Sequence, residues 1–280
     1  MNCLLVVNTL SGNASRVRED ELIRKYAVGD SVTVQYIREE DDLYSVDGVD
    51  KLIICGGDGT LNHAINLCRD KDIDIYYLPF GTFNETAKGQ RRGSDRELAK
   101  LGRIGDSDFA YVAAAGSFTD IGYSLSTKSK RRFKLLAYFS RVLMSYRVHR
   151  IRADVTCESF SESDTYTLLM LSNAKRCFGF RFNRLHRDNS DELQLILVKA
   201  PKKDNLWGRI KMFFPFFRVF FIGCGKDYTS KNIRFLSVEK VSLSLHDETP
   251  FCVDGECRPF SGEITAYKTE HTARVHLIKP

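Results

Sequence analysis

The stretch Lys51-Leu-Ile-Ile-Cys-Gly-Gly-Asp-Gly-Thr-Leu-Asn-His-Ala-Ile65 predicts a buried strand, a glycine-rich turn and a helix. Glycine adopts backbone conformations that side chains forbid, so consecutive N–H groups of the turn can converge on an anion. A helix that begins near Thr60 adds the positive end of its dipole at the same point. Asp58 lies in the same turn, and a carboxylate repels phosphate unless a metal ion or a reacting hydroxyl separates them. The stretch therefore predicts phosphoryl transfer rather than passive anion binding.

The composition of the chain is typical of a globular protein rather than of a membrane-spanning one. With 280 residues, 43% hydrophobic and 28% charged, the chain is typical of a globular protein with one large or two modest domains. We see no N-terminal signal sequence and no apolar run of the roughly 18 to 20 residues that a membrane span needs. The eight cysteines form no C-x-x-C pair, which favours reduced thiols and a cytoplasmic location.

The pattern of predicted elements changes along the chain. Residues 1–115 alternate strands and helices, one helix being expected at about 95–101, which is typical of a parallel sheet covered by helices. Beyond residue 150, short strands with polar turns predict an antiparallel sandwich. We therefore predict an α/β plus all-β fold, with an α/β domain at 1–115 and a β-rich domain at 116–280, whose final strand packs back near the first domain.

Two further turns are expected to lie beside the first one. Asn8-Thr-Leu-Ser-Gly12 and Pro79-Phe-Gly-Thr-Phe-Asn-Glu-Thr-Ala87 each follow a predicted strand. The carboxyl ends of parallel strands share one edge of a sheet, and that edge is where such sheets bind ligands. Each turn by itself is more often a helix cap or a plain turn than a binding loop. The chain lacks the G-x-x-x-x-G-K-[ST] and G-x-G-x-x-G motifs of the common nucleotide folds. A last motif, Asp254-Gly-Glu256, is also typical of a plain hairpin.

The order of these motifs resembles the lipid-kinase superfamily of diacylglycerol kinases and sphingosine kinases, above all its small bacterial soluble branch. The family pattern N-x-x-S-G, G-G-D-G-T, P-x-G-T-x-N-x-x-A and D-G-E occurs in order across nearly the whole chain. G-G-D-G-T alone is shared with NAD kinases and phosphofructokinases. The late D-G-E and the β-rich second half favour the lipid kinases, so 116–280 is interpreted as the lipid-substrate domain and 1–115 as the nucleotide-binding domain.

The resemblance implies an active site in a cleft between the domains, with ATP and Mg²⁺ as cofactors and a hydroxyl of diacylglycerol or a related membrane lipid as acceptor. Asp58 would interact with the phosphates through Mg²⁺, and Asp254 would be the general base, with Glu256 supporting the base or the metal. The alternatives are an NAD-kinase-type enzyme with a soluble substrate and an inactive nucleotide- or lipid-binding regulator. The implied nucleotide contacts are Asn8, Thr9, Ser11, Gly12, Gly56, Gly57, Asp58, Gly59, Thr60, Asn62, Thr82 and Asn84.

A structural Mg²⁺ site is also implied by the resemblance. Relatives bind this ion in a D-G-x-L-type turn, and the matching segment here is Asp188-Asn-Ser-Asp-Glu-Leu193, with Glu192 in place of glycine. Asp191 is the expected side-chain ligand, with backbone carbonyl groups from Asp188 and Leu193. A solvated acidic turn is the competing interpretation.

Two segments indicate how a chain without a membrane span reaches a lipid. Residues 1–115 carry a net charge of −5 and residues 116–280 one of +11, and Lys128–Arg152 holds nine cations and no acidic residue. Leu206–Ile222 is rich in aromatic residues, which suits a membrane interface or an acyl-chain groove. A buried helix pair kinked at Pro215 is the alternative, and both interpretations can hold in different parts of the segment. We expect a cytoplasmic protein in peripheral contact with an anionic membrane surface. No nucleic-acid motif is present, and a homodimer remains open.

Overall fold

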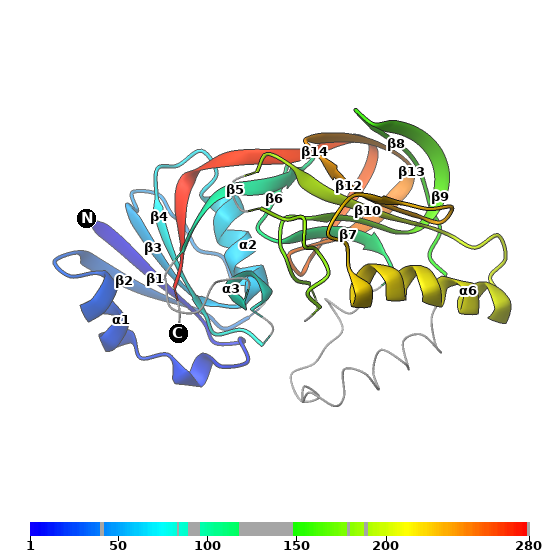
Figure 1. The fold of residues 1–280 in the computed structure, drawn as a ribbon. Coiled ribbons are helices and arrows are strands. Elements are labelled where there is room, and N and C mark those ends of the chain that lie inside the picture. The colour runs from blue at the N-terminus through cyan, green and yellow to red at the C-terminus, as the bar shows by residue number, and fades with distance from the viewer. Residues whose placement is uncertain are drawn as a thin grey trace. The chain divides into compact units, whose positions relative to one another are not determined.

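The computed structural model describes residues 1–39, 42–82, 84–88, 96–117, 148–177, 180–187 and 190–278 (Figure 1). The chain divides into two compact units: unit 1 comprises residues 1–101 and 270–280, and unit 2 comprises residues 102–269. Most of the basic segment 128–152 lies outside the described residues. Among the residues described, no helix combines the length and the apolarity needed to cross a bilayer.

Unit 1 is built on a parallel sheet. Its strand order is β2-β1-β3-β4-β14, and every neighbouring pair runs parallel. The strands β1 and β3 are almost fully buried, as continuous apolar runs predict for a sheet covered on both faces. The elements are β1 (Asn2–Asn8), η1 (Ala14–Arg16), α1 (Glu19–Tyr26), β2 (Ser31–Ile37), β3 (Lys51–Gly56), α2 (Asp58–Leu67), β4 (Asp74–Pro79), α3 (Glu85–Lys88) and the end of β14 (Glu256–Leu277).

Unit 2 is built from antiparallel strands around two apolar cores. Strands β7, β9, β10 and β13 lie at its centre, and each pairs antiparallel with its neighbours within the unit. The predicted combination of a parallel α/β part and an antiparallel β part is confirmed. The elements are β6 (Ser107–Phe109), β7 (Val112–Gly116), β8 (Ile151–Cys157), β9 (Phe160–Ser172), β10 (Leu193–Lys199), α6 (Leu206–Phe216), the π-helix η2 (Phe217–Ile222), β11 (Tyr228–Thr229), β12 (Ile233–Val238), β13 (Lys240–Val253) and the first part of β14.

The predicted helix at 95–101 is wrong: from Arg96 the chain forms a strand, β5 (Arg96–Ile104). Its Glu-Leu-Ala-Lys-Leu sequence has good helix propensity, but β5 pairs with β6 and β14. Gly102 lies directly opposite Phe109, and a Cβ atom on Gly102 would lie 2.1 Å from the Phe109 ring. Tertiary pairing therefore overrides the local preference.

The first part of unit 1 ends at residue 101, and unit 2 begins at residue 102. The sequence predicts a domain boundary between residues 115 and 116. Strands β6 and β7 account for the difference. β6 pairs with the end of β5, and β7 lies between β9 and β13, so both strands belong to the antiparallel unit.

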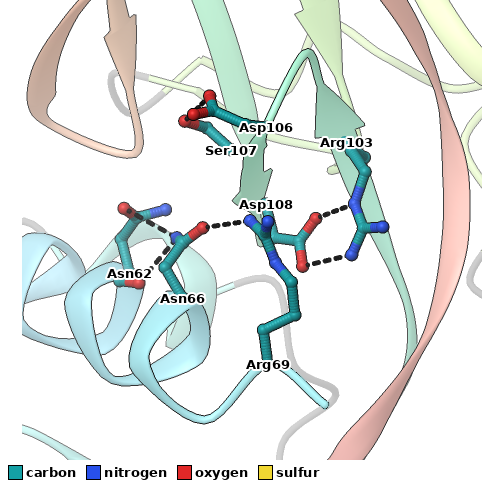
Figure 2. Close-up of polar contacts among 7 residues, drawn as sticks. All are labelled: Asn62, Asn66, Arg69, Arg103, Asp106, Ser107 and Asp108. Atoms are coloured by element: carbon teal, nitrogen blue, oxygen red, sulfur yellow. Dashed lines mark hydrogen bonds and ion pairs between the residues drawn. The ribbon is translucent and has the colours of Figure 1, made fainter.

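A buried ion pair holds the corner between β5 and β6 (Figure 2). Asp108 is fully buried, and Arg103 donates to it twice, Nε to Oδ1 at 2.5 Å and Nη2 to Oδ2 at 2.9 Å. This hydrogen bonding with Asp108 raises the pKa of Arg103 above its usual value. The neighbouring Asp106 is exposed and accepts a hydrogen bond from the Ser107 hydroxyl.

We expect Asp108→Asn to lower the free energy of unfolding of unit 2 by about 3 kcal/mol, since it leaves a partly buried guanidinium without its counter-charge. Asp106→Asn is the matched control and should change it by less than about 0.5 kcal/mol. Denaturant titration of both variants measures the difference, and equal stabilities would contradict a structural role for the pair.

Candidate functional site

The three predicted turns of unit 1 meet at the carboxyl ends of β1, β3 and β4. The side-chain amide of Asn8, at the end of β1, donates to Thr60 Oγ1 at 2.8 Å. Asn13 reaches the third turn twice, with its backbone N–H 2.9 Å from the Phe80 carbonyl oxygen and its side-chain amide 2.9 Å from that of Gly81. Hydrogen bonds therefore connect the first turn to both of the others.

The second and third turns touch through their glycines. The Gly56 carbonyl oxygen accepts from the backbone N–H groups of Phe80, at 2.8 Å, and Gly81, at 2.9 Å. A Cβ atom on Gly81 would lie only 2.4 Å from the Gly57 Cα, whereas a Cβ on Gly57 would lie 3.5 Å from the Gly81 Cα. The close approach of the two backbones therefore requires glycine at position 81 but not at position 57.

The N-terminus of α2 has no side-chain cap. Gly57 is the N-cap residue, so no side chain from that position covers the first turn, and the helix hydrogen bonds begin with Leu61 N–H to Gly57 O at 3.1 Å. The first N–H groups of a helix have no partner within the helix, and the helix dipole favours an anion beside them. Gly57, Asp58, Gly59 and Thr60 are all half-exposed at this end.

Asp58 connects the second turn to α3. Its carboxylate accepts from the backbone N–H of Glu85, at 2.9 Å to Oδ2, and of Thr86, at 3.1 Å to Oδ1. Burial raises the pKa of Asp58, and these two backbone hydrogen bonds act in the opposite direction. The carboxylate thus anchors the first turn of α3, a contact that the sequence did not predict; its role toward Mg²⁺ stays a prediction.

In unit 2, Asp254 and Gly255 form the two-residue turn between β13 and β14. Both have positive φ, +51° and +103°, so the hairpin that the Asp-Gly pair predicts is present. The Asp254 side chain does more than shape the turn. It is 1% exposed, and its carboxylate accepts three backbone N–H groups: from Ala110 at 2.5 Å, Tyr111 at 3.0 Å and Val112 at 2.9 Å. Glu256, two residues later, is exposed.

Comparison with known proteins identifies what this chain is similar to. Residues 2–107 match the diacylglycerol kinase catalytic domain. The predicted resemblance is therefore confirmed. The chain is also similar over 251 residues to a diacylglycerol kinase of Bacillus subtilis (strain 168), at 22% identity, covering 82% of this chain and 78% of the relative.

Solved structures share the fold of this diacylglycerol kinase-like chain. A diacylglycerol kinase from Bacillus anthracis str. Sterne has a TM-score of 0.64 at 14% identity, over 98% of this chain and 96% of that one. An NAD kinase from Archaeoglobus fulgidus in complex with ATP has a TM-score of 0.51 at 13% identity, over 98% and 93%. At such identities the similarity shows the fold alone.

The remaining predicted nucleotide contacts of the kinase domain differ in exposure. Thr9, Gly12 and Thr82 are exposed and Ser11 is half-exposed, so all four are accessible from solvent. Asn84 has a positive φ of +47°, and its amide donates to the carbonyl oxygens of Pro79 and Gly81, both at 2.9 Å, so it shapes the third turn.

Asn62 differs from these residues because it is fully buried. It lies on α2, and its carbonyl oxygens accept from the Asn66 amide, the backbone oxygen at 2.9 Å and the side-chain oxygen at 3.3 Å (Figure 2). Asn66 in turn accepts from Arg69 Nη2 at 2.9 Å. These contacts place Asn62 in a polar row along α2, and its predicted contact with the nucleotide remains a prediction.

A lysine side chain reaches the segment that is predicted to hold the structural Mg²⁺, and the metal site itself stays a prediction. Asp188 lies outside the described residues, Asp191 is exposed, and Leu193 is buried at the start of β10. Lys268, only 9% exposed, donates from Nζ to the carbonyl oxygen of Ser190 at 2.9 Å and to that of Arg187 at 3.4 Å. Within the described ranges, no three His, Cys, Asp or Glu residues are grouped as a metal site. Because like charges repel, an ammonium in this turn disfavours a divalent ion beside it.

We expect Gly81→Ala to lower the free energy of unfolding of unit 1 by about 1–3 kcal/mol, because its Cβ would overlap backbone atoms that cannot rotate away. Gly57→Ala adds the same methyl group on the other side of the contact, where a Cβ atom has room at 3.5 Å from the Gly81 Cα. This variant should leave the free energy of unfolding nearly unchanged. Thermal unfolding of the two variants makes the comparison. A Gly81→Ala variant as stable as Gly57→Ala would show that the two turns do not approach as closely as described.

We also expect the melting temperature of the wild-type protein to be unchanged by EDTA, since Lys268 already supplies positive charge to the 187–193 turn. Lys268→Met keeps much of the side-chain volume but removes the ammonium donor from the carbonyl oxygens of Ser190 and Arg187, of which Arg187 keeps the Ser190 backbone N–H, at a cost of about 1–3 kcal/mol. Calorimetry with and without EDTA tests both statements. A wild-type melting temperature that falls in EDTA and recovers with Mg²⁺ would instead support the metal ligands Asp188, Asp191 and Leu193.

Proposed function

We propose that the chain is an ATP-dependent lipid kinase that transfers the γ-phosphate of ATP to a hydroxyl of diacylglycerol or a related membrane lipid. The observation that carries the proposal is the meeting of the three turns of unit 1 at the uncapped N-terminus of α2, within the residues that match the diacylglycerol kinase catalytic domain. Such a helix end binds phosphate through backbone N–H groups and the helix dipole.

The residues of unit 1 suit the two cofactors. Around the phosphates, the backbone N–H groups of the first turn of α2 would donate, together with the accessible hydroxyl groups of Ser11 and Thr82. When bound with the nucleotide, Mg²⁺ would neutralise charge that develops on the phosphates. Asp58 fits a position facing that ion, because a carboxylate has about four acceptor sites and the backbone of α3 uses two of them. Its two backbone hydrogen bonds would hold it in place.

In unit 2, we assign the proton transfer to Asp254. A carboxylate that accepts charge-assisted hydrogen bonds from three backbone N–H groups is held in one orientation. A carboxylate so positioned can accept the proton of an attacking hydroxyl late in phosphoryl transfer. Glu256 lies in the same hairpin and is exposed, so it would support the base or the metal.

The identity of the molecule that accepts the γ-phosphate distinguishes this proposal from its alternatives. Incubation with ATP labelled at the γ-phosphate, a panel of lipids including diacylglycerol, and NAD would place the label in the organic phase, in NAD or in neither. Label in lipid supports a lipid kinase, and label in NAD supports an NAD-kinase-type enzyme. No transfer to any acceptor would support a nucleotide- or lipid-binding regulator.

We further propose that the protein acts in the cytoplasm at an anionic membrane surface, without a nucleic-acid partner and as a monomer or homodimer.

Asp254→Asn should lower kcat by about 10²–10⁴-fold, the usual contribution of a positioned general base. The Michaelis constant for ATP should change little, because the nucleotide contacts are assigned to unit 1. Glu248→Gln, which removes an exposed carboxylate of β13, the strand that precedes the Asp254 turn, is the control and should retain full activity. A variant Asp254→Asn with wild-type kcat would exclude Asp254 as the base.

A further inference from the structure

The helical segment α6–η2 has two different faces. Met212, Phe216, Val219 and Phe220 are buried and belong to an apolar core that includes residues of β7, β9, β10 and β12. The opposite side exposes six large apolar side chains, which we call the aromatic face. Its members, with their exposed fractions, are Trp207 (70%), Phe213 (39%), Phe214 (68%), Phe217 (39%), Phe221 (36%) and Ile222 (49%).

The aromatic face is ordered and continuous. Phe213 stacks on Phe217 with ring centroids 5.7 Å apart, and Phe217 stacks on Phe221 at 5.2 Å. Trp207 and Phe214 lie seven residues apart in α6, so they share one side of that helix. The segment 206–222 is therefore buried on one face and exposed on the other. A contiguous exposed apolar patch on a folded protein is typical of an interaction site.

Positive charge borders the aromatic face. No acidic residue occurs between Leu206 and Ile222, and the exposed Lys211 lies between the aromatic residues. The loop before α6 adds Lys202 and Lys203, also exposed.

This loop is fixed against the helix. A Cβ atom on Gly208 would lie 2.1 Å from the Lys203 carbonyl oxygen, so that glycine permits close packing. Arg150 donates to the carbonyl oxygens of Pro201 and Lys202, at 2.8 and 3.1 Å. The lysines and the aromatic face are therefore held as one surface.

We propose that the aromatic face inserts into the interface of a membrane that contains anionic lipid, while Lys202, Lys203 and Lys211 contact its head groups. Aromatic side chains with nearby cations are suited to this zone, where one part of the surface is apolar and the other is hydrated and negative. A second copy of the chain is a less suitable partner, because a symmetric contact through this face would bring the same lysines together. The inference rests on the proposed function in one respect: it names the surface from which the lipid substrate is reached.

Trp207 offers a direct test because it is the only tryptophan in the chain. The full-length protein is mixed with phosphatidylcholine vesicles, with and without phosphatidylglycerol, and both co-sedimentation and tryptophan emission are recorded. We expect binding to the anionic vesicles with a blue shift of the emission. Binding without any blue shift, or no binding, would overturn the proposal. A blue shift that appears without vesicles as protein concentration rises would overturn it in favour of a contact between copies.

Variants separate the two contributions. Trp207→Ala/Phe214→Ala should weaken vesicle binding about tenfold or more through lost apolar burial, while Leu43→Ala, an isolated exposed apolar residue of unit 1, should not. Lys203→Gln/Lys211→Gln should weaken binding to anionic vesicles by about fivefold for each charge, with Lys231→Gln/Lys240→Gln as the charge-matched control. Equal losses in variant and control would show that net charge, and not this surface, drives binding.

Kinase assays keep this inference distinct from the proposed function. Phosphorylation of a short-chain, water-soluble diacylglycerol reports the active site without a membrane. Activity there together with failure of the vesicle test would reject only the docking surface. Vesicle binding with a Trp207 blue shift but no transfer to any lipid would reject only the lipid-kinase assignment.

Discussion

The structure of unit 1 depends on one close backbone contact. The Gly56 carbonyl oxygen accepts two N–H groups from the turn after β4, and this is possible because Gly81 has no side chain to separate it from Gly57. The contact joins the ends of two neighbouring strands, and Asn13 joins the end of β1 to the same turn. The uncapped N-terminus of α2 is thereby placed where the three turns meet. Gly81 is thus required for the packing of the two turns.

The two acidic residues of the motifs share a physical role. Asp58 accepts backbone N–H groups from residues 85 and 86, and Asp254 accepts them from residues 110 to 112. Each carboxylate therefore satisfies backbone donors that burial would otherwise leave without water, and each is fixed in orientation by them. A residue fixed in this way is preorganised for chemistry, so a structural and a catalytic role are compatible at both positions.

Features that depend on interactions between residues close in sequence were predictable, and features that depend on distant residues were not. The parallel and antiparallel sheets were predictable because hydrophobic periodicity and turn residues act locally. The strand β5 was mistaken for a helix because Glu-Leu-Ala-Lys-Leu favours a helix until pairing with β6 and β14 decides otherwise. Lys268 could not be assigned to the 187–190 turn from sequence, since about 80 residues separate them and a lone lysine in a strand carries no signal.

The sequence by itself determined the fold class and the set of turns that meet in unit 1. Consecutive residues specify both, through strand periodicity and through the order of G-G-D-G-T and its two companion turns. Only the tertiary structure decided what each side chain contacts: Asp58 reaches donors 27 and 28 residues away, and Asp254 reaches donors 142 to 144 residues away. It also decided that one side of α6–η2 is buried while the other stays exposed. Burial and hydrogen bonding of this kind arise between distant segments, so no local pattern can encode them.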